Sequence, residues 1–562
     1  MTSDEDILRI NKAIIGRGKQ VYDETVEFSK NPKTSEELLF TIIRDNQNTE
    51  YGKLHNFADV RTLDDYRKKV PLSTFDEYAE YVAREIMNGE KGLYCAYELK
   101  QYNRSSGTMG NPKKIPMSKK SMEMFLDRSV ILPFGVAAKE LGDNFADGKI
   151  LSVMEASALA YIGNIRYCGV SAQQVLDVLD KYSEIFTSPR EASCPDKSTD
   201  SRYLHARYGL AEKNVVCLHS SFSTFILDLF HYIGNNWEML CNDIESGKID
   251  PSVKMTDEIR SKLESELVPM PERAQELRKI FSEGIDNKIA KKIWPNLAFM
   301  NAVCTGAFSA YLKNLRENYT GDVPVCYESV CASEGAFCGP LSMNCSDFVP
   351  YGNTMFFEFL PLGEEDQEKT LTLDSLKVGE EYEMIVTTCS GLYRYRTRDA
   401  YRVTGKYNEV PTLEYLYRMD MCVNLNGEKT YEPALRKAVD LTAEEIGFKY
   451  LDFCVYPDTD MVPSCYRFFI EMTERPKKID LNEIAKSLQK NLCIANPMLI
   501  YKFERSLCGP VIAHILQDET YLLYRDKLIM KGGASTQVKP VKIIMNEAQL
   551  RFFRILIDKE AE

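Results

Sequence analysis

The sequence predicts an α/β protein with at least two domains, and three observations support this prediction. The chain has 562 residues, whereas a single hydrophobic core stops growing at about 250–300 residues. Helical and strand-like segments are mixed along residues 1–417, which we assign to a large N-terminal α/β domain. From residue 418 onwards the segments are shorter, which predicts a small C-terminal α+β domain over 418–562.

The N-terminal part begins with segments whose apolar residues recur at helical spacing. Ile7, Ile10 and Ile14 follow this pattern within a helix that we expect over 4–29. Further expected elements are a helix over 33–46, a helix over 118–141 broken at Pro133, a strand followed by a helix over 215–233, and a charged helical stretch over 253–293.

Strand character dominates later in the chain. Aromatic and β-branched residues alternate over 379–404, which predicts antiparallel strands. In the C-terminal part the expected elements are helices over 432–446, 480–493 and 519–530, and strands over 450–456 and 465–472.

Charge and cysteine usage exclude several functional classes. The formal charge is 70 − 83 = −13, and an acidic balance argues against nucleic-acid binding. The 16 cysteines form no C-x-x-C pair and there are 5 histidines, which argues against a zinc site and favours buried free thiols. The first 29 residues are charged and no run of about eighteen apolar residues occurs. We therefore expect a cytoplasmic protein without a membrane span.

The segment RSSGTMGNPKK, residues 104–114, is the first candidate site. Its small and hydroxyl-bearing residues are Ser105, Ser106, Gly107, Thr108 and Gly110, followed by Lys113 and Lys114. Glycine lets successive N–H groups point at one anion, and hydroxyls and lysines add donors and positive charge. The segment follows a strand-like stretch and lacks the Gly-Lys-Ser/Thr ending of a Walker A loop. It is either a phosphate-binding loop or a polar surface turn.

Two further segments carry candidate residues for phosphate and metal binding. Thr305 lies where a strand is expected to give way to a helix, and a helix start is either an anion site or simply a cap. Glu334 follows Ala332 and Ser333 at the expected end of a β segment. A carboxylate there is suited to Mg²⁺ held together with nucleotide phosphates, and the alternative is an ordinary Ser-Glu-Gly turn.

The last candidates lie near the expected domain boundary and beyond it. Asp399 ends an alternating strand with Arg394, Arg396 and Arg398, and such an acid can accept hydrogen bonds from ribose hydroxyls. The alternative is a cross-strand ladder of arginine and aspartate that contributes little. Two loops of the C-terminal part carry lysines suited to a phosphate contact, at Lys429 and Lys539.

Taken in this order, the segments resemble the acyl-acid amido synthetases, the auxin-responsive Gretchen Hagen family, within the acyl-adenylate-forming, firefly-luciferase-like superfamily. The signature SSGT-x-x-G-x-x-K corresponds to 105–114 with slightly altered spacing, the Tyr-x-Ser-Ser-Glu-type signature to 330–334, and YR-x-GD to 395–399. The flanking stretch 48–82 and the loop 531–540 also resemble the family, and the similarity is weakest over 140–300. The ordered set is more specific than any single motif.

The chain departs from the family pattern at two motifs. Cys331 and Ala332 stand where the family favours a small or aromatic residue and a serine. Arg398 replaces the usual glycine before Asp399. Despite these departures we still expect the protein to use a nucleotide. What the departures affect is the set of individual contacts that these residues make with it.

The resemblance implies an adenylating-enzyme architecture, in which the large domain contains a β-barrel-like part and the small domain rotates over the active site. It implies an ATP- and Mg²⁺-dependent ligase that converts a carboxylic acid to an acyl-adenylate and pyrophosphate and then joins the acyl group to an amine, typically of an amino acid. The nucleotide-binding residues it implies are Ser105, Ser106, Gly107, Thr108, Gly110, Thr305, Ala332, Ser333, Glu334, Tyr393, Asp399 and Arg418.

The resemblance also assigns roles to individual residues. Glu334 holds Mg²⁺ and, with Lys429 and Lys539, belongs to the catalytic group, while Arg418 is the hinge. The acyl pocket is expected largely from 120–240. No nucleic-acid or membrane partner is expected, and a monomer fits the sequence. The alternatives are an acyl-CoA ligase that uses the same adenylation step, a nucleotide-binding module without catalysis, and a scaffold without a ligand.

Overall fold

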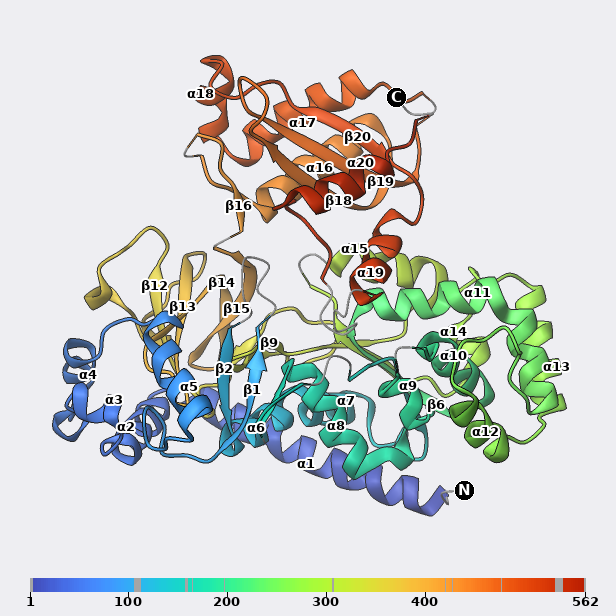
Figure 1. Cartoon of the computed structure of the whole chain (residues 1–562), viewed down its shortest axis with the longest axis horizontal. Coiled ribbons are helices and arrows are strands. Elements are labelled where there is room, and N and C mark those ends of the chain that lie inside the picture. Colours follow the sequence, from blue (N-terminus) through green and yellow to red (C-terminus); the bar gives the residue numbers. More distant parts are fainter. Residues whose placement is uncertain are drawn as a thin grey trace. The chain divides into compact units, whose positions relative to one another are not determined.

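The computed structural model describes residues 4–105, 113–156, 160–163, 165–196, 198–305, 308–419, 421–426, 428–476, 478–530 and 539–559. The chain divides into two compact units (Figure 1). Unit 1 comprises 1–397, 401–415 and 534–537, and unit 2 comprises 398–400, 416–533 and 538–562. Both units mix helices with sheets, so the fold class is mixed α/β.

Unit 1 begins with long helices that pack around its sheets. Its helices are α1 (Asp4–Lys30), α2 (Thr34–Asn46), α3 (Glu50–Leu54), α4 (Leu63–Lys69), α5 (Asp76–Asn88), α6 (Lys119–Leu126), α7 (Leu132–Leu141), α8 (Val170–Tyr182), α9 (Arg190–Ser193), α10 (Ser201–Ala211), α11 (Ser223–Ser246), α12 (Asp257–Glu266), α13 (Pro271–Ser282), α14 (Ala290–Ile293) and α15 (Ser309–Leu315). Helices α1 and α7 approach closely at two glycines, since a Cβ atom on Gly18 would lie 2.6 Å from the backbone nitrogen of Gly135. Side chains at this contact would push the two helices apart.

A parallel sheet forms the centre of the N-terminal region. Its strands, in spatial order, are β3 (Lys149–Ser152), β6 (Val215–Phe222), β7 (Phe299–Val303) and β8 (Val325–Tyr327). Parallel strands need crossover connections and are covered on both faces, which explains their apolar sequences and the helices between them. The carboxyl ends of the four strands therefore lie along one edge.

Two smaller sheets carry the first two motifs. One has the order β2 (Lys114–Ser118), β1 (Leu99–Arg104), β5 (Ile165–Cys168), β4 (Ala160–Ile162), and the other β11 (Val349–Pro350), β10 (Gly335–Gly339), β9 (Val330–Ala332). Strands β1 and β2 form an antiparallel hairpin, as do β9 and β10. Each motif thus lies at the turn of a hairpin.

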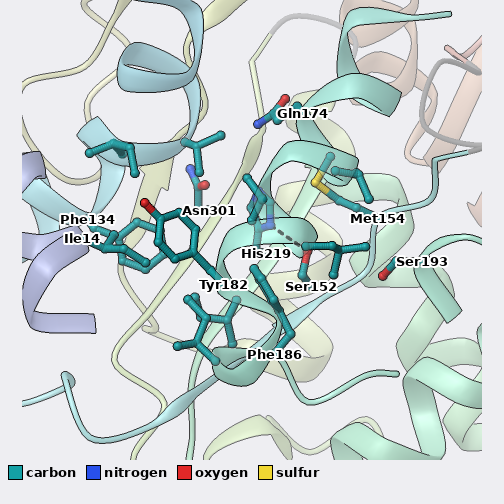
Figure 2. A pocket seen from close by; sticks show the side chains of 17 residues that line it. Ile14, Phe134, Ser152, Met154, Gln174, Tyr182, Phe186, Ser193, His219 and Asn301 are labelled. Atoms are coloured by element: carbon teal, nitrogen blue, oxygen red, sulfur yellow. Dashed lines mark hydrogen bonds between the residues drawn. The ribbon is translucent and has the colours of Figure 1, made fainter. Parts of the chain in front are cut away.

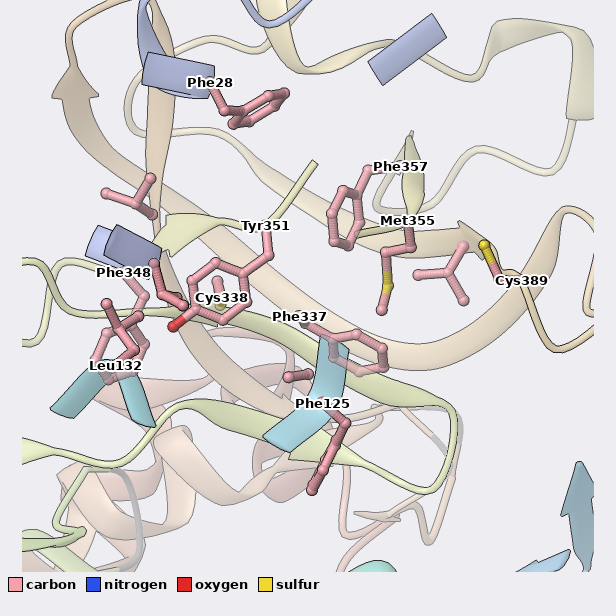
Figure 3. Close-up of a cluster of buried hydrophobic side chains, with 14 of the residues drawn as sticks. Phe28, Phe125, Leu132, Phe337, Cys338, Phe348, Tyr351, Met355, Phe357 and Cys389 are labelled. Atoms are coloured by element: carbon pink, nitrogen blue, oxygen red, sulfur yellow. The ribbon is translucent and has the colours of Figure 1, made fainter. Parts of the chain in front are cut away.

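The last sheet of unit 1 supplies much of its hydrophobic core. Its order is β12 (Phe356–Pro361), β13 (Glu381–Thr387), β14 (Tyr395–Tyr407), β15 (Val410–Arg418). Figure 3 shows part of this core, where Phe337 and Cys338 of β10 meet Tyr351 and Phe357 together with Leu132 of α7. The hydroxyl of Tyr351 lies 2.8 Å from the Ser329 hydroxyl, which in turn donates to the Arg128 carbonyl at 2.8 Å. This chain of bonds fixes the segment that leads into β9.

Unit 2 is a three-stranded sheet covered by helices on both faces. The sheet has the order β18 (Lys449–Asp458), β19 (Cys465–Glu474), β20 (Ile512–Leu516), beside a short ladder of β16 (Cys422–Val423) and β17 (Thr430–Tyr431). The helices are α16 (Glu432–Ile446), α17 (Leu481–Ala495), α18 (Met498–Glu504), α19 (Thr520–Met530) and α20 (Glu547–Ile555). Because side chains alternate along a strand, Phe453 and Val455 pack with α16 and α17, whereas Cys454 packs with α19 and α20.

Most expected elements are confirmed, with informative differences. The expected helix over 118–141 consists of α6, a π-helical segment over Asp127–Ile131, and α7, with Pro133 near the start of α7. The charged stretch over 253–293 contains three separate helices. Strand β20 and helices α18 and α20 were not predicted. The β-barrel-like part and the domain boundary at 417/418 stay predictions.

Candidate active site

The described residues of the first motif stand at the paired ends of β1 and β2. Ser105 follows β1 directly, and its backbone N–H donates to the Lys113 carbonyl at 3.2 Å. The Ser105 hydroxyl accepts from the Lys113 N–H at 2.9 Å. These two bonds close the base of the loop. Ser106, Gly107, Thr108 and Gly110 lie outside the described residues, so their phosphate-binding role stays a prediction.

A hydrogen bond joins the first motif to the second. Asn103, fully buried in β1, donates from Nδ2 to the carbonyl oxygen of Ser333 at 2.6 Å. The two residues are 230 positions apart in the sequence. The end of the strand that leads into the serine-rich loop therefore lies against the turn that carries Glu334.

The second motif forms the tight turn between β9 and β10. Ala332 ends β9, and Ser333 and Glu334 make the turn. Gly335 has a φ of +153°, and a Cβ atom there would lie 2.7 Å from Cε of Met355. Glycine is therefore needed directly after Glu334. The Glu334 residue is 7% exposed.

The carboxyl edge of the parallel sheet contributes Thr305 and a residue that sequence analysis missed. Thr305 lies between β7 and α15, as expected. Glu328 follows β8, and its N–H donates to the Ala302 carbonyl at 3.0 Å. Desolvation of the buried carboxyl raises the pKa of Glu328 to about 8. An acidic residue straight after a short apolar strand was the signal in the sequence.

The end of the third motif, Arg398 and Asp399, belongs to unit 2, where three of the expected site residues come together. Asp399 is largely buried and pairs with Arg418, whose Nη1 lies 3.3 Å from the Asp399 Oδ1. Lys539 keeps an exposed surface, yet desolvation lowers the pKa of its ammonium group. The Asp399 carboxylate raises this pKa, and the Arg418 guanidinium lowers it further. The structure thus brings the motif aspartate, the expected hinge arginine and the loop lysine into one electrostatic group.

The residue before Asp399 has an unusual backbone. Arg398 has a φ of 61°, a left-handed conformation that glycine adopts without steric cost. Its carbonyl accepts from the Met419 N–H at 2.8 Å. The family's glycine at this position therefore corresponds to a backbone bend that this chain keeps with an arginine.

Tyr393 and Arg394 belong to the core. The Tyr393 ring is fully buried and its hydroxyl donates to the Tyr94 carbonyl at 2.8 Å. The ring therefore packs within the core, and the expected nucleotide contact of Tyr393 stays a prediction. Arg394 is fully buried and pairs with Glu358 at 3.0 Å, which differs from the weak surface ladder considered for this strand.

Lys429 occupies a separate, anchored loop. It is exposed, with a φ of 44°, and precedes β17. The neighbouring Glu428 is buried and accepts from the N–H groups of Leu425 and Asn426, each at 2.7 Å, and from the Tyr466 hydroxyl at 2.7 Å. These bonds hold the loop that presents the lysine.

A cavity in unit 1 lies between the parallel sheet and its covering helices (Figure 2). The residues that line it are Ile14, Val130, Ile131, Phe134, Ile150, Ser152, Met154, Gln174, Val175, Val178, Leu179, Tyr182, Ile185, Phe186, Ser193, His219 and Asn301. Most of them fall within 120–240, the range expected for an acyl pocket. None of these lining residues is Asp, Glu, Lys or Arg. Desolvation lowers the pKa of His219 to about 4, so that side chain is neutral at pH 7.

The described part of the chain offers neither a ready metal centre nor a membrane-spanning helix. Within it, no three His, Cys, Asp or Glu side chains form a group able to hold a metal ion. No helix in the same residues is long and apolar enough to cross a membrane.

The fold and the motifs define a class, and comparisons with known proteins identify the family. The solved structure described as "GH3.15 acyl acid amido synthetase" superposes with a TM-score of 0.83 at 24% identity, covering 95% of each chain. A 2-hydroxyisobutyryl-CoA ligase in its postadenylation state superposes with a TM-score of 0.51 at 10% identity, covering 97% of this chain and 91% of that one. The fold is therefore that of adenylate-forming enzymes.

Family models cover almost the whole chain. The GH3 family N-terminal domain matches residues 21–325, the central domain 348–418 and the C-terminal domain 434–548. The chain belongs to the GH3 family, as its motifs suggested, and by class it is an acid–amino acid ligase.

Curated relatives extend along the same length. A probable indole-3-acetic acid-amido synthetase of Oryza sativa subsp. japonica is 28% identical over 583 residues, which cover 95% of each chain. A 4-substituted benzoates-glutamate ligase of Arabidopsis thaliana is 27% identical, covering 95% of this chain and 98% of the relative.

Proposed function

We propose that this GH3 protein activates a carboxylic acid with ATP as an acyl-adenylate and transfers the acyl group to the amine of an amino acid. Membership of an adenylating family implies ATP use. The observation that carries the residue-level proposal is the 2.6 Å hydrogen bond between Asn103 and Ser333. It joins the serine-rich hairpin to the turn with Glu334, as a common phosphate site in unit 1 requires.

The first half-reaction demands control of negative charge. A carboxylate oxygen attacks the α-phosphorus of ATP, pyrophosphate leaves, and charge accumulates on the phosphoryl oxygens. Backbone N–H groups and hydroxyls of the loop that begins at Ser105 would bind the phosphates. In unit 2, Asp399 would accept from the ribose hydroxyls and Lys539 would donate to a phosphate oxygen.

Mg²⁺ fits the residues of the second motif. Mg²⁺ usually takes one or two carboxylates together with substrate phosphates, and Glu334 offers one carboxylate on a fixed turn. When bound, the ion would neutralise charge on the phosphates. Glu334 would hold the ion, and Gly335 keeps the turn tight enough to present it.

The second half-reaction requires a neutral amine at the acyl carbon. The amine nitrogen attacks that carbon, AMP leaves with the bonding electron pair of the broken C–O bond, and the amine loses a proton. Because acyl-adenylates hydrolyse readily, water must be excluded between the two steps.

Product analysis tests the proposal. The protein is incubated with ATP, Mg²⁺ and a panel of carboxylic acids, and pyrophosphate release is measured. Mass spectrometry then follows each active acid with a mixture of amino acids or with CoA. We expect acid-dependent pyrophosphate and an acyl–amino acid amide. A CoA thioester without an amide would instead indicate an acyl-CoA ligase, and no acid-dependent pyrophosphate would reject the adenylation step.

A further inference from the structure

A row of three polar side chains crosses the wall of the apolar cavity. In the strand register Ser152 of β3 pairs with His219 of β6, and His219 pairs with Asn301 of β7. Register partners on neighbouring strands present their side chains on the same face of a sheet. Figure 2 shows His219 between Ser152 and Asn301. We call Ser152, His219 and Asn301 the polar row.

The polar row is set into mostly apolar surroundings. The Ser152 hydroxyl lies 2.9 Å from Nδ1 of His219, and Asn301 donates from Nδ2 to the Cys326 carbonyl at 3.1 Å. Ile150, two residues before Ser152 in β3 and on the same face of the sheet, is buried and apolar. Polar groups within an apolar wall are costly unless they find partners. Three polar side chains at paired positions on adjacent strands mark a place where hydrogen bonding is needed.

The charge of the cavity limits what it can hold. None of its lining residues carries a formal charge at pH 7, because the one titratable imidazole is held neutral by desolvation. A carboxylate placed there would lack a counter-ion. The cavity therefore suits the uncharged body of a ligand whose charged group lies elsewhere.

The cavity shares its supporting elements with the proposed site of adenylation. Ser152 is the last residue of β3, and Thr305 follows β7 at the same carboxyl edge of the sheet, where ligands of open α/β sheets bind. Helix α8, which lines the cavity, begins shortly after β5, and β5 pairs with β1 of the first motif. The cavity wall is thus continuous with the strand that leads to Ser105.

We propose that the polar row determines substrate specificity: it recognises one uncharged polar substituent, such as a hydroxyl, on the otherwise apolar body of the acid. This inference rests on the proposed function for the identity of the ligand. The neutral imidazole of His219 offers a donor or an acceptor, and the Ser152 hydroxyl can do either. A substrate with the substituent gains a hydrogen bond to these half-buried groups that the parent acid lacks, so the parent acid is disfavoured.

Matched acids test the inference in the reaction. Pyrophosphate release is measured with 3-phenylpropanoic acid and its ortho-, meta- and para-hydroxy derivatives. We expect the wild type to prefer one hydroxy isomer over the parent by about tenfold in kcat/KM, the effect of one buried hydrogen bond. Ser152→Ala and His219→Phe should abolish this preference, read as the ratio of kcat/KM for the preferred hydroxy isomer to kcat/KM for the parent acid in the same variant, so that a general loss of activity cancels. Ser193→Ala, a cavity-lining serine outside the row, is the matched control.

Neutral probes separate this inference from the proposed function. Phenol should raise the melting temperature of the wild type more than toluene does, and His219→Phe should remove the difference. If no acid yields pyrophosphate but the phenol preference depends on His219, adenylation is wrong and the polar row stands as a binding feature. If pyrophosphate forms without any preference for a hydroxy isomer, or with a preference that both row variants retain, the specificity role is overturned. Equal shifts by phenol and toluene would also overturn it.

Discussion

Among single residues, Asp399 carries the most direct prediction. The Asp399→Ala substitution removes the carboxylate that we propose for the ribose hydroxyls, so it should raise KM for ATP at least about tenfold or abolish pyrophosphate release. Asp460→Ala, which changes an exposed aspartate of the same unit, is the control. Unchanged pyrophosphate kinetics in a folded Asp399→Ala protein would count against the ribose role.

Two substitutions of Arg398 distinguish the effect of the backbone conformation on stability from the effect of the side chain. Replacement by glycine or by valine removes the guanidinium equally, but the φ of 61° is free of strain for glycine alone. The β-branched valine should therefore make the protein less stable than the glycine variant by about 1–2 kcal/mol. Thermal or urea unfolding of the two variants measures the difference. Equal stabilities would show that the bend relaxes without cost.

Glu471 predicts a dependence of stability on pH. Burial raises the pKa of Glu471 from its ordinary 4.5 to about 7, while N–H groups of Glu519 and Tyr521, each at 2.9 Å, act in the opposite direction. A raised pKa means that the contribution of Glu471 is complete below about pH 4.5 and is lost as the pH rises through about 7.

The Glu471→Gln variant cannot titrate at this position, so the stability of the wild type relative to it should fall between pH 4.5 and pH 8, by on the order of 3 kcal/mol at most. Unfolding of both proteins at several pH values is the measurement. A difference that stays constant with pH would mean that Glu471 keeps an ordinary pKa.

The sequence predicts site residues only where they carry local signatures. Glu334 and Asp399 stand within motifs, and the positive φ of Gly335 explains why a glycine follows Glu334. The polar row had no such signature, because Ser152, His219 and Asn301 become neighbours only through strand register. The burial of Tyr393 was equally hidden, since a tyrosine beside a motif looks the same whether its ring faces a ligand or a core.

At the scale of elements, Arg394, the residue before β14, ties the start of this strand to β12 and to the C-terminal end of α4. Its guanidinium pairs with the buried Glu358 of β12 and donates to the carbonyls of Arg67 at 3.0 Å and Val70 at 2.9 Å. Arg394→Met leaves the buried Glu358 with Arg67 as its remaining guanidinium partner, at 3.1 Å, and removes the buried hydrogen bonds of the Arg394 guanidinium, so it should cost about 3 kcal/mol. Arg402→Met, within β14 and at a more exposed pair with Glu381, should cost about 0–1 kcal/mol. Denaturation of both variants measures the costs, and similar values would contradict the buried-pair interpretation.

The spacing of apolar residues was sufficient to predict the long helices, but it did not predict the short elements. Helices α1 and α16 have several turns of regular apolar spacing, and their predicted bounds agree with the structure within one residue. Helix α18 has 7 residues and β20 has 5. In segments this short, the helical spacing of apolar residues cannot be told from the alternation of a strand. Helix α20 was missed because its buried residues are only Leu550 and Phe553.

At the scale of the whole molecule, the division of labour between the two units is the main proposal. Unit 1 contains the serine-rich hairpin, Glu334 and the cavity, whereas unit 2 contains Asp399, Arg418 and both candidate lysines. Rotation of the small domain stays a proposal from family resemblance, with Arg418 as its hinge. A lysine from unit 2 should serve one half-reaction more than the other, which kinetics can resolve.

Lys539 should serve adenylation. It shares an electrostatic environment with Asp399, the proposed ribose ligand, whereas Lys429 lies in a separately anchored loop. Lys539→Met should lower acid-dependent pyrophosphate release by about 10²–10³-fold, the usual effect of removing one group that stabilises transition-state charge. Amide formation from a chemically supplied acyl-adenylate should change by less than about threefold, because the β- and γ-phosphates have already left as pyrophosphate before that step. Lys429→Met tests the competing lysine, and Lys486→Met on the exposed face of α17 is the control. Equal losses in both half-reactions, or a loss with Lys429→Met alone, would move the phosphate contact away from Lys539.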